Sequence, residues 1–458
     1  MNQLPVLDIR LSFRRGGVHM DDHKVTAAMP IERFLPKEVV LPLSQHIGPE
    51  ATAIVKRKDT VTRGMLIGAE ETLGAPVHAS VNGTVKSVIR RPHPTLTEAS
   101  AIVIETNAEA TDPQFEEDPE WRRLSQEEML TRIAKAGIVG LGGASFPTHR
   151  KLRLPPGVRI DTLIINGAEC EPYLTSDHRL MLERTEDLVK GACLIGRIVD
   201  ARQIIIGIED NKADAAAMLQ KTIDDFSDTM PRPWVRVCKT RYPQGSEKQL
   251  VEALANRVIP SGKLPMHVGC LVQNVATAIA CYRAIRFREP LMDRVVTVSG
   301  KGIRTPKNLL VPIGTLISDI VLHCGGMTDD ACMVIAGGPM MGRALSRLDV
   351  PVIKGTGGLL FFTEDQIEHE MYGPCISCGR CLDVCPLGLE PNQISLYTEA
   401  GLALETLPFG TRDCFECGSC AYVCPAKRPL TQFIQIAKSA LMRKTALGIA
   451  VRPGGPHG

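Results

Sequence analysis

Aromatic residues and long apolar runs are both scarce in this sequence. Phe, Trp and Tyr together make up 4% of the 458 residues, which disfavours aromatic-cored sandwiches. The best apolar run, residues 204–208, is bounded by Arg202 and Glu209, so no segment is expected to span a bilayer. The N-terminus has neither an apolar core segment nor a small-residue cleavage site. We therefore expect no secretory signal and a cytosolic chain.

An excess of one charge is also lacking. Lys and Arg number 53 against 51 Asp and Glu, a formal net charge of +2, which disfavours a protein whose whole surface binds nucleic acid. Hydrophobic residues at 44% and charged residues at 23% are typical of globular domains. The length predicts about three domains. The 40 Gly and 32 Pro favour turn-rich β modules and glycine-rich binding loops.

Cysteine, by contrast, is abundant, and its spacing is regular. The 15 cysteines are too many to be read as disulfides in a reducing compartment. Two runs read C-x2-C-x2-C-x3-C and end before Pro386 and Pro425. This is the spacing of bacterial ferredoxins with two 4Fe-4S clusters, in which the fourth cysteine of each run binds the other cluster. The predicted ligand sets are Cys375, Cys378, Cys381 and Cys424 for one cluster, and Cys414, Cys417, Cys420 and Cys385 for the second. Two structural zinc sites are the alternative.

A glycine-rich loop follows a predicted helix near residue 137. The helix begins at an S-x-x-E capping box formed by Ser125 and Glu128. Closely spaced glycines let backbone N–H groups approach a phosphate, and a following cation such as Lys151 neutralises it. The glycines of the loop are Gly140, Gly142 and Gly143. A glycine-rich turn that binds no ligand remains the alternative.

The next segments alternate between strand and helix patterns. Residues 163–165 read as a buried parallel strand that ends in the acidic turn 166–172, and residues 203–208 read as a second strand. Helices are predicted around 213–219 and 247–255, which completes an α/β pattern. Because α/β proteins bind ligands at the carboxyl ends of parallel strands, the acidic turn is a candidate site. Cys170 lies in this turn, and we assign it no chemical role.

Four ordered segments carry a resemblance to a known family. GLGGASFPT, INGAECEP, YPQGSEKQL and VQNVAT resemble the flavin-binding and NADH-binding segments of the flavoprotein subunit of respiratory NADH dehydrogenase. Together with the ferredoxin repeat, residues 25–440 resemble the RnfC (RsxC) family, whose members are subunits of the Rnf complex, an ion-translocating electron-transport complex. The resemblance implies a cofactor site for FMN, NAD(H) as substrate, and no catalytic acid or base among the side chains.

The resemblance also implies roles for individual residues. The FMN cradle would be Gly140, Gly142, Gly143 and Lys151. Asn166 and Glu169 would lie near the isoalloxazine and ribityl groups, and Phe146 would stack on nicotinamide or adenine. The site would be closed by Gly245, Glu247, Asn274 and Thr277. Three residues depart from the respiratory pattern, since Leu141 replaces an Arg, Ala168 an acid and Ser246 a Glu.

Other segments resemble accessory modules. Residues 50–90 resemble a lipoyl-type barrel-sandwich module without the lipoyl-lysine hairpin, and Asn82-Gly83 predicts a type I′ hairpin turn. Residues 291–350 resemble a β-grasp (SLBB-like) module. The fold class expected is therefore multidomain α/β and α+β with a Rossmann-like flavin domain. The expected limits are 1–112 for the barrel-sandwich region, 113–290 for the FMN/NADH domain, 291–354 for the β-grasp module, 355–440 for the ferredoxin domain and 441–458 for a basic tail.

The resemblance implies a peripheral oxidoreductase subunit on the cytoplasmic face of the inner membrane. It would pass electrons between NAD(H), FMN and two 4Fe-4S clusters, because a flavin takes two electrons and releases them singly. Its partners would be other subunits of the membrane complex and a ferredoxin-type iron-sulfur protein. The basic tail would dock on an anionic membrane surface or an acidic partner, or else be an ordinary solvated helix face. Two alternative functions remain: a soluble NADH dehydrogenase module of another reductase, and an iron-sulfur relay subunit that lacks flavin.

Overall fold

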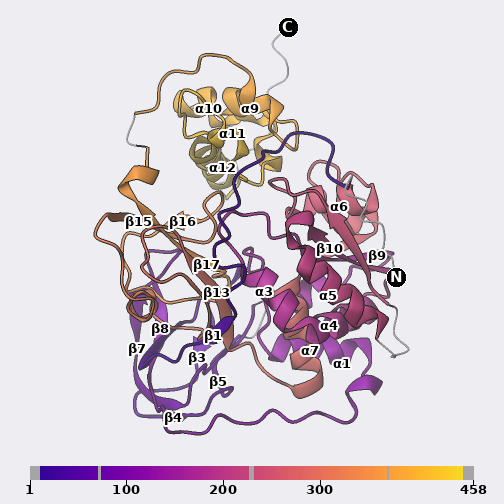
Figure 1. Ribbon diagram of the computed structural model, residues 1–458, viewed down its shortest axis with the longest axis vertical. Helices are drawn as coiled ribbons and strands as arrows, with labels where there is room; N and C mark the ends of the chain where they lie inside the picture. Colours follow the sequence, from indigo (N-terminus) through magenta and orange to yellow (C-terminus); the bar gives the residue numbers. More distant parts are fainter. Residues whose placement is uncertain (1–10, 71–73, 226–231, 369–370, 447–458) are drawn as a thin grey trace.

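The computed structural model describes residues 11–70, 74–225, 232–368 and 371–446. In Figure 1 the α/β domain lies on one side and the two β modules on the other, and the helical C-terminal domain sits above both. The first described residues form a strap that crosses the α/β domain, with Leu11 bridged to Cys238 and Val18 to Tyr242. Within the described ranges, no helix is long and apolar enough to cross a membrane.

The N-terminal β module consists of two small antiparallel sheets. Their orders are β2-β8-β7-β4 and β3-β5-β6, as expected for a barrel-sandwich fold. The strands are β2 (Glu38–Pro42), β3 (Thr52–Ala53), β4 (Thr60–Val61), β5 (Leu66–Ala69), β6 (Val77–His78), β7 (Gly83–Pro92) and β8 (Glu98–Thr106).

The predicted type I′ turn at Asn82 and Gly83 is wrong. Such a turn needs positive φ at both residues, and neither residue has it. Strands β6 and β7 lie in different sheets, so the chain crosses between sheets here. A Cβ on Gly83 would come within 2.0 Å of the Glu105 carbonyl oxygen. The glycine is therefore required by a close approach of two backbones.

The α/β domain has a parallel sheet of order β11-β10-β9-β12. The strands are β9 (Thr162–Gly167), β10 (Gln203–Glu209), β11 (Trp234–Cys238) and β12 (Cys270–Asn274). The helices are α1 (Gln126–Lys135), α2 (Thr148–Leu152), α3 (Ser176–Glu183), α4 (Thr185–Ile198), α5 (Ala213–Asp224), α6 (Glu247–Ala255) and α7 (Val275–Phe287). Since β10 lies on one side of β9 and β12 on the other, the strand order reverses between β9 and β12, and such reversals are where α/β folds bind ligands.

Local sequence explains the start and end of α1. The Ser125 hydroxyl accepts a hydrogen bond from the Glu128 amide at 3.3 Å, and the Glu128 carboxylate accepts one from the Ser125 amide at 2.8 Å. This confirms the predicted capping box. After the helix, Gly137 has φ +67°, a conformation that glycine adopts without cost.

The β-grasp module is a six-stranded sheet of order β1-β14-β13-β17-β15-β16. Its elements are β1 (Ile31–Arg33), β13 (Asp293–Ser299), β14 (Lys307–Pro312), α8 (Ile317–His323), β15 (Ala331–Ala336), β16 (Arg343–Ala344) and β17 (Gly358–Thr363). Strand β17 pairs with β13 and β15 although it follows residue 354. We therefore propose that this domain extends to Thr363; the other expected limits stay predictions.

The C-terminal domain is built around two short helices that contain parts of the cysteine runs. These are α9 (Arg380–Asp383) and α11 (Ser419–Tyr422), each preceded by a glycine with positive φ, Gly379 at +78° and Gly418 at +80°. The longer helices are α10 (Pro391–Glu399) and α12 (Leu430–Ala446). Short 3₁₀ helices complete the chain: η1 (Trp121–Arg123), η2 (Asp210–Lys212), η3 (Pro265–Val268), η4 (Glu364–Gln366), η5 (Ala403–Phe409) and η6 (Thr411–Asp413).

Candidate functional site

The candidate flavin crevice lies where β9 and β12 end. Asn166, near the end of β9, donates from Nδ2 to the Gly245 carbonyl at 2.8 Å. Asn274 ends β12 and caps α7, because its Oδ1 accepts from the Ala276 amide at 2.9 Å. The two asparagines are paired across adjacent strands. The strand reversal thus places both predicted residues at one edge of the sheet.

The glycine-rich loop stands over this edge. It is closed by a hydrogen bond from the Gly140 amide to the Phe146 carbonyl at 2.8 Å. The Leu141 amide donates to the Thr277 hydroxyl at 2.9 Å, which ties the loop to α7. Gly143 has φ +108°, and a Cβ built there would meet no atom within 4 Å. The tip of the loop therefore has the open space and accessible backbone that a phosphate needs.

A Cβ on Gly142 would lie 3.3 Å from the Asn274 Cβ, so the loop and the cap of α7 are in direct proximity. Two further predicted residues meet across a long sequence separation, since Lys151 of α2 forms an ion pair with Glu247 of α6. Phe146 is 44% exposed. An exposed ring on the loop is accessible for stacking on a planar ligand.

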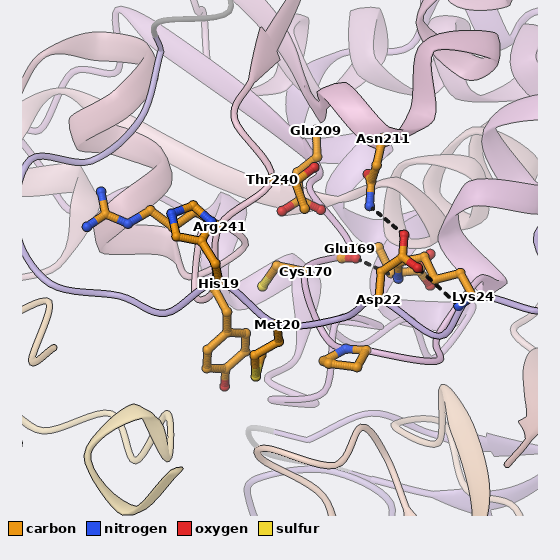
Figure 2. Close-up of a pocket in the computed structure, with 12 residues that line it drawn as sticks. His19, Met20, Asp22, Lys24, Glu169, Cys170, Glu209, Asn211, Thr240 and Arg241 are labelled. Atoms are coloured by element: carbon orange, nitrogen blue, oxygen red, sulfur yellow. Dashed lines mark hydrogen bonds between the residues drawn. The ribbon is translucent and has the colours of Figure 1, made fainter. Parts of the chain in front are cut away.

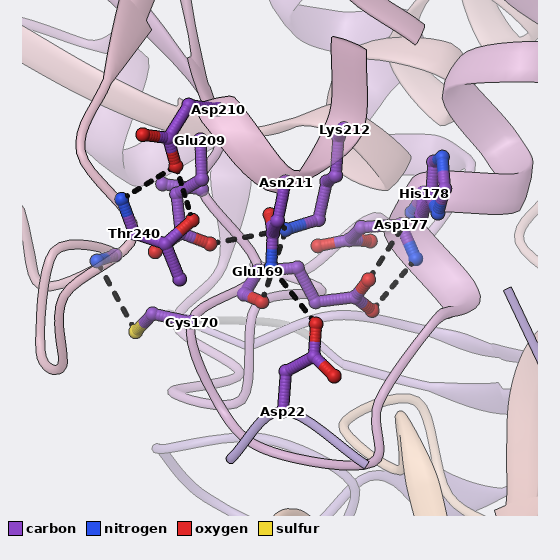
Figure 3. A network of polar contacts seen from close by, with 12 residues as sticks. Asp22, Glu169, Cys170, Asp177, His178, Glu209, Asp210, Asn211, Lys212 and Thr240 are labelled. Carbon is purple, nitrogen blue, oxygen red and sulfur yellow. Dashed lines mark hydrogen bonds and ion pairs between the residues drawn. The ribbon is translucent and has the colours of Figure 1, made fainter. Parts of the chain in front are cut away.

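Glu169 has a role that the sequence did not suggest. Its buried carboxylate accepts hydrogen bonds from the amides of Asp177 and His178, at 2.9 and 3.2 Å, and from the Ser176 hydroxyl at 3.2 Å (Figure 3). These are free donors at the start of α3, where a negative charge is favourable. Glu169 therefore fixes the orientation of α3 against the acidic turn.

Asp177 is a site residue that sequence reasoning missed. Its Oδ2 accepts from Asn274 Nδ2 at 2.6 Å, which joins α3 to the cap of α7. Burial raises the pKa of Asp177, and the nearby Glu169 carboxylate raises it further. No local pattern marks this residue, because its partner Asn274 lies 97 positions away in the sequence.

Two lysines hold the acidic turn from behind. The Lys212 ammonium lies 3.0 Å from the Glu209 carboxylate, and both side chains are fully buried (Figure 3). Lys24, from the N-terminal strap, donates to the carbonyls of Glu169 and Glu171, each at 3.0 Å. Burial lowers the pKa of Lys24, and Lys212 lowers it further. These contacts immobilise the backbone that carries Glu169.

Cys170 lines a small pocket between the strap and the ends of β10 and β11 (Figure 2). Burial raises the pKa of its thiol, and the Glu209 carboxylate adds to the shift. A thiol that stays protonated is a poor nucleophile and a poor metal ligand. The geometry thus offers no chemical role for this cysteine.

Four of the predicted cluster ligands surround one cavity in the C-terminal domain. They are Cys375, Cys378, Cys381 and Cys424. The first three come from the first run, and the fourth comes from the second run, as the ferredoxin spacing predicts. On the outer side Cys378 is exposed, and the neighbouring Ile376 is 63% exposed. This thiol group therefore lies at the surface.

The other four thiols form a second group. Burial raises the pKa of Cys414 to about 12, and the adjacent Cys417 and Cys385 raise it as well. Burial also raises the pKa of Cys420, with further increases from Cys417, Cys414 and Cys385. Cys385 of the first run thus lies beside all three cysteines of the second triplet.

The second thiol group packs against the α/β domain. Tyr242 donates from its hydroxyl to the Cys417 carbonyl at 2.6 Å and is itself buried. The Gly262 amide donates to Asp413, next to Cys414, at 2.9 Å. Gly16 of the strap lies so close to Cys385 that a Cβ there would come within 2.6 Å of its carbonyl group. The two thiol groups are therefore inequivalent: one faces the flavin crevice side and one faces outward.

The cations of the basic C-terminal region have acidic partners from elsewhere in the chain. Lys427 pairs with Glu368, and Arg428 pairs with Glu399 at 2.6 Å. Lys438 donates to the Cys414 carbonyl at 2.8 Å and contacts Glu416. Much of the predicted tail 441–458, from residue 447 on, lies outside the described residues, so its docking role stays a prediction.

Family models match four consecutive parts of the chain. The RnfC barrel sandwich hybrid domain matches residues 11–109, and the Nuo51 FMN-binding domain matches 133–283. The SLBB domain matches 295–344, and the 4Fe-4S dicluster domain matches 374–427. These matches confirm the expected fold class and module order.

Curated relatives match nearly the whole chain. The RnfC subunit of the proton-translocating ferredoxin:NAD(+) oxidoreductase complex of Clostridium ljungdahlii is 44% identical over 432 residues, which is 93% of each chain. The RnfC subunit of the ion-translocating oxidoreductase complex of Rhodobacter capsulatus is 42% identical and covers 94% of this chain and 83% of its own length. The RnfC subunit of the Na(+)-translocating ferredoxin:NAD(+) oxidoreductase complex of Acetobacterium woodii is 40% identical, with 95% and 98% covered.

A solved structure shares the fold at low identity. A chain of the NAD+-reducing NiFe hydrogenase in its H2-reduced state aligns with a TM-score of 0.51 and 17% identity, over 74% of this chain and 69% of that one. At this identity the likeness shows the fold alone.

Proposed function

Because the chain belongs to the RnfC family of ion-translocating ferredoxin:NAD+ oxidoreductase complexes, we propose that it exchanges electrons between NAD(H), FMN and two 4Fe-4S clusters. The chain is an oxidoreductase subunit with an FMN-binding domain and a dicluster ferredoxin domain. The observation that carries the proposal is the contact of one thiol group with the α/β domain through Tyr242 and Cys417. This contact gives a short route between the two kinds of site.

The thiols fit two iron-sulfur cubes better than they fit zinc ions. In the described part of the chain, no three His, Cys, Asp or Glu side chains stand close enough to hold a single metal ion. All fifteen cysteines lie in this part, and none is in a disulfide. Three thiols of one run and one of the other surround each space, which is the ligand arrangement of a two-cluster ferredoxin. We propose that these eight cysteines are the cluster ligands.

The crevice fits a phosphorylated flavin. The backbone at Gly143 faces open space, and the N-terminus of α7 lies beside the loop through Asn274 and Thr277. A helix N-terminus next to a glycine-rich loop is a favourable place for a phosphate. We propose Gly140, Gly142, Gly143, Lys151, Asn166, Asn274 and Thr277 as the FMN-binding residues. The proposal places Gly245, Glu247, Glu169 and Phe146 around the same site, with Phe146 available to stack on the nicotinamide nucleotide.

FMN, when bound, takes the electron pair of a hydride and releases it as single electrons, which is the form that iron-sulfur clusters carry. The chain's own residues set the order of the route. The group of Cys414, Cys417, Cys420 and Cys385 would connect to the flavin, and the group at Cys378 would meet the outside. The exposed Ile376 and Cys378 mark the surface for a ferredoxin-type partner. The proposal places the protein on the cytoplasmic face of the membrane, bound to the membrane subunits of its complex.

Cofactor content tests the proposal directly. Anaerobically purified protein should contain about eight iron, about eight sulfide and about one FMN per chain. NADH should bleach the flavin absorbance. Full iron with no flavin, even after incubation with FMN, would instead support an iron-sulfur relay subunit, and zinc in place of iron would overturn both hypotheses.

Two matched glycine variants test the position of the flavin. Gly143→Ala should lower the bound FMN, because the methyl group fills the open space above the loop. Gly157→Ala is the control, since Gly157 also has positive φ, at +81°, and a Cβ there would also meet nothing within 4 Å. Both variants carry the same backbone strain of about 1 kcal/mol. Equal FMN content in the two variants would argue against the proposed crevice.

A further inference from the structure

One buried cation beside the flavin crevice comes from the β-grasp module. Arg294 lies near the start of β13 and is 3% exposed. Its Nη2 donates to the Leu141 carbonyl in the glycine-rich loop at 2.5 Å, and its Nε donates to the Thr356 carbonyl at 3.0 Å. The guanidinium therefore reaches from one domain into the loop of another.

The charge of Arg294 is balanced by two carboxylates of the crevice. Burial lowers the pKa of Arg294, and Asp177 and Glu169 oppose this shift. A guanidinium nevertheless stays protonated in proteins. Burying a charge without a partner is very costly, and two carbonyl acceptors could be satisfied by a neutral donor. The proximity of Asp177 and Glu169 is what makes a cation suitable at this position.

Other contacts show that the β-grasp module already holds the acidic turn without Arg294. The Thr175 amide donates to the Thr297 hydroxyl at 3.0 Å, and the Thr175 hydroxyl donates to the Asn308 side-chain oxygen at 2.8 Å. Both acceptors lie on the strands β13 and β14. Domain packing therefore does not depend on the guanidinium alone, which leaves its charge as the distinctive contribution.

The crevice would repel an anion without this cation. Asp177 is half-buried at the crevice and bonded to Asn274, one of the proposed FMN ligands. Lys151, the other nearby cation, is already paired with Glu247. In a site of low dielectric, charges several ångströms apart interact strongly. Two carboxylates beside a dianionic phosphate therefore need a compensating positive charge.

We propose that Arg294 is a positioning residue for FMN: its guanidinium orders the glycine-rich loop and offsets the Asp177 and Glu169 carboxylates, so that the phosphate of the flavin is accepted. This inference rests on the proposed function, because it assumes that FMN binds in the crevice. It assigns the β-grasp module a direct part in the flavin site.

The test compares FMN with riboflavin, which has the same ring but no phosphate. Arg294→Gln keeps a hydrogen-bond donor and loses the charge, so its dissociation constant for FMN should rise about tenfold or more, or about 1.4 kcal/mol. Its affinity for riboflavin should change about threefold or less. Arg294→Lys keeps the charge and should retain the preference of the wild type for FMN over riboflavin. Flavin fluorescence quenching on the full apo-flavin chain measures both ligands.

Arg63→Gln is the matched control. Arg63 is also buried, and it pairs with Asp293, the residue next to Arg294. This variant should leave the FMN preference unchanged. An equal loss of both ligands in Arg294→Gln, or no loss of either, would overturn the inference. If the wild type itself binds no FMN, the proposed function fails, and that result is distinct from wild-type binding with an unaffected Arg294→Gln.

Discussion

Lys354 gives the most quantitative prediction for this protein. Its side chain is 1% exposed, and its Nζ donates to the carbonyls of Pro76 and Gly137, each at 2.8 Å. These contacts join the barrel-sandwich module, the end of α1 and the segment that leads to β17. Burial lowers the pKa of Lys354 from 10.5 to about 7. The neighbouring His78 does not titrate near neutral pH, because burial and Lys354 lower its pKa to about 3.

The sign of the pH dependence follows from this shift. Between pH 7 and 10.5 the unfolded chain binds a proton at Lys354 that the folded protein has released, so stability rises with pH across this window. The cost of the shift is about 4 kcal/mol at pH 7 and about 2 kcal/mol at pH 9. Lys354→Met removes this cost and leaves two carbonyls without a partner, at about 1–3 kcal/mol each.

The free energy of unfolding of Lys354→Met relative to the wild type should therefore change by about 2 kcal/mol between pH 9 and pH 7, in favour of the variant at pH 7. Urea unfolding at the two pH values measures it, followed by the fluorescence of Trp121, which is buried in the main core with α1. Lys301→Met is the control, because Lys301 is exposed and Asp365 raises its pKa. A difference that does not depend on pH would refute the argument and show that Lys354 titrates normally.

Two further predictions concern the clusters. Cys385→Ser should perturb the paramagnetic resonance signal of the cluster whose triplet starts at Cys414 and leave the other signal intact, with Cys424→Ser as the reciprocal control; loss of the Cys375 cluster would contradict the ligand sets. Tyr242→Phe leaves the Cys417 carbonyl without its donor, which should destabilise the domain contact by about 1–3 kcal/mol and alter the signal of the same cluster. The exposed Tyr422→Phe is its control, and identical spectra for both tyrosine variants would argue against the proposed route.

Local patterns predicted much of the fold. The helix at 247–255 coincides with α6, and the apolar residues 163–165 lie inside β9. The cysteine spacing predicted which thiols meet, since Cys424 lines the cavity of the first run. Such features depend on periodicity, capping or short spacing, so one segment carries enough information. The Asn82-Gly83 turn failed because the strands that flank it pair with different sheets, which the dipeptide does not specify.

The parts that could not be predicted depend on distant pairs. Asp177 becomes a site residue only through Asn274, and Arg294 only through Leu141 in another module. Lys24 is 145 residues from Glu169, whose carbonyl it binds. None of these residues lies at a helical or strand spacing from its partner. Tertiary packing alone brings them to the crevice.

The inequivalence of the two thiol groups follows from such distant contacts as well. The two cysteine runs are repeats with the same spacing, so sequence symmetry predicts two similar clusters. The strap breaks this symmetry, because the Gly17 amide donates to the Val384 carbonyl at 2.8 Å beside Cys385, and Tyr242 binds the backbone of Cys417. Both contacts fall on one thiol group. A symmetric electron carrier thereby acquires an inner end at the flavin domain and an outer end at Cys378, so the order of the route is set by packing and not by the cysteine spacing.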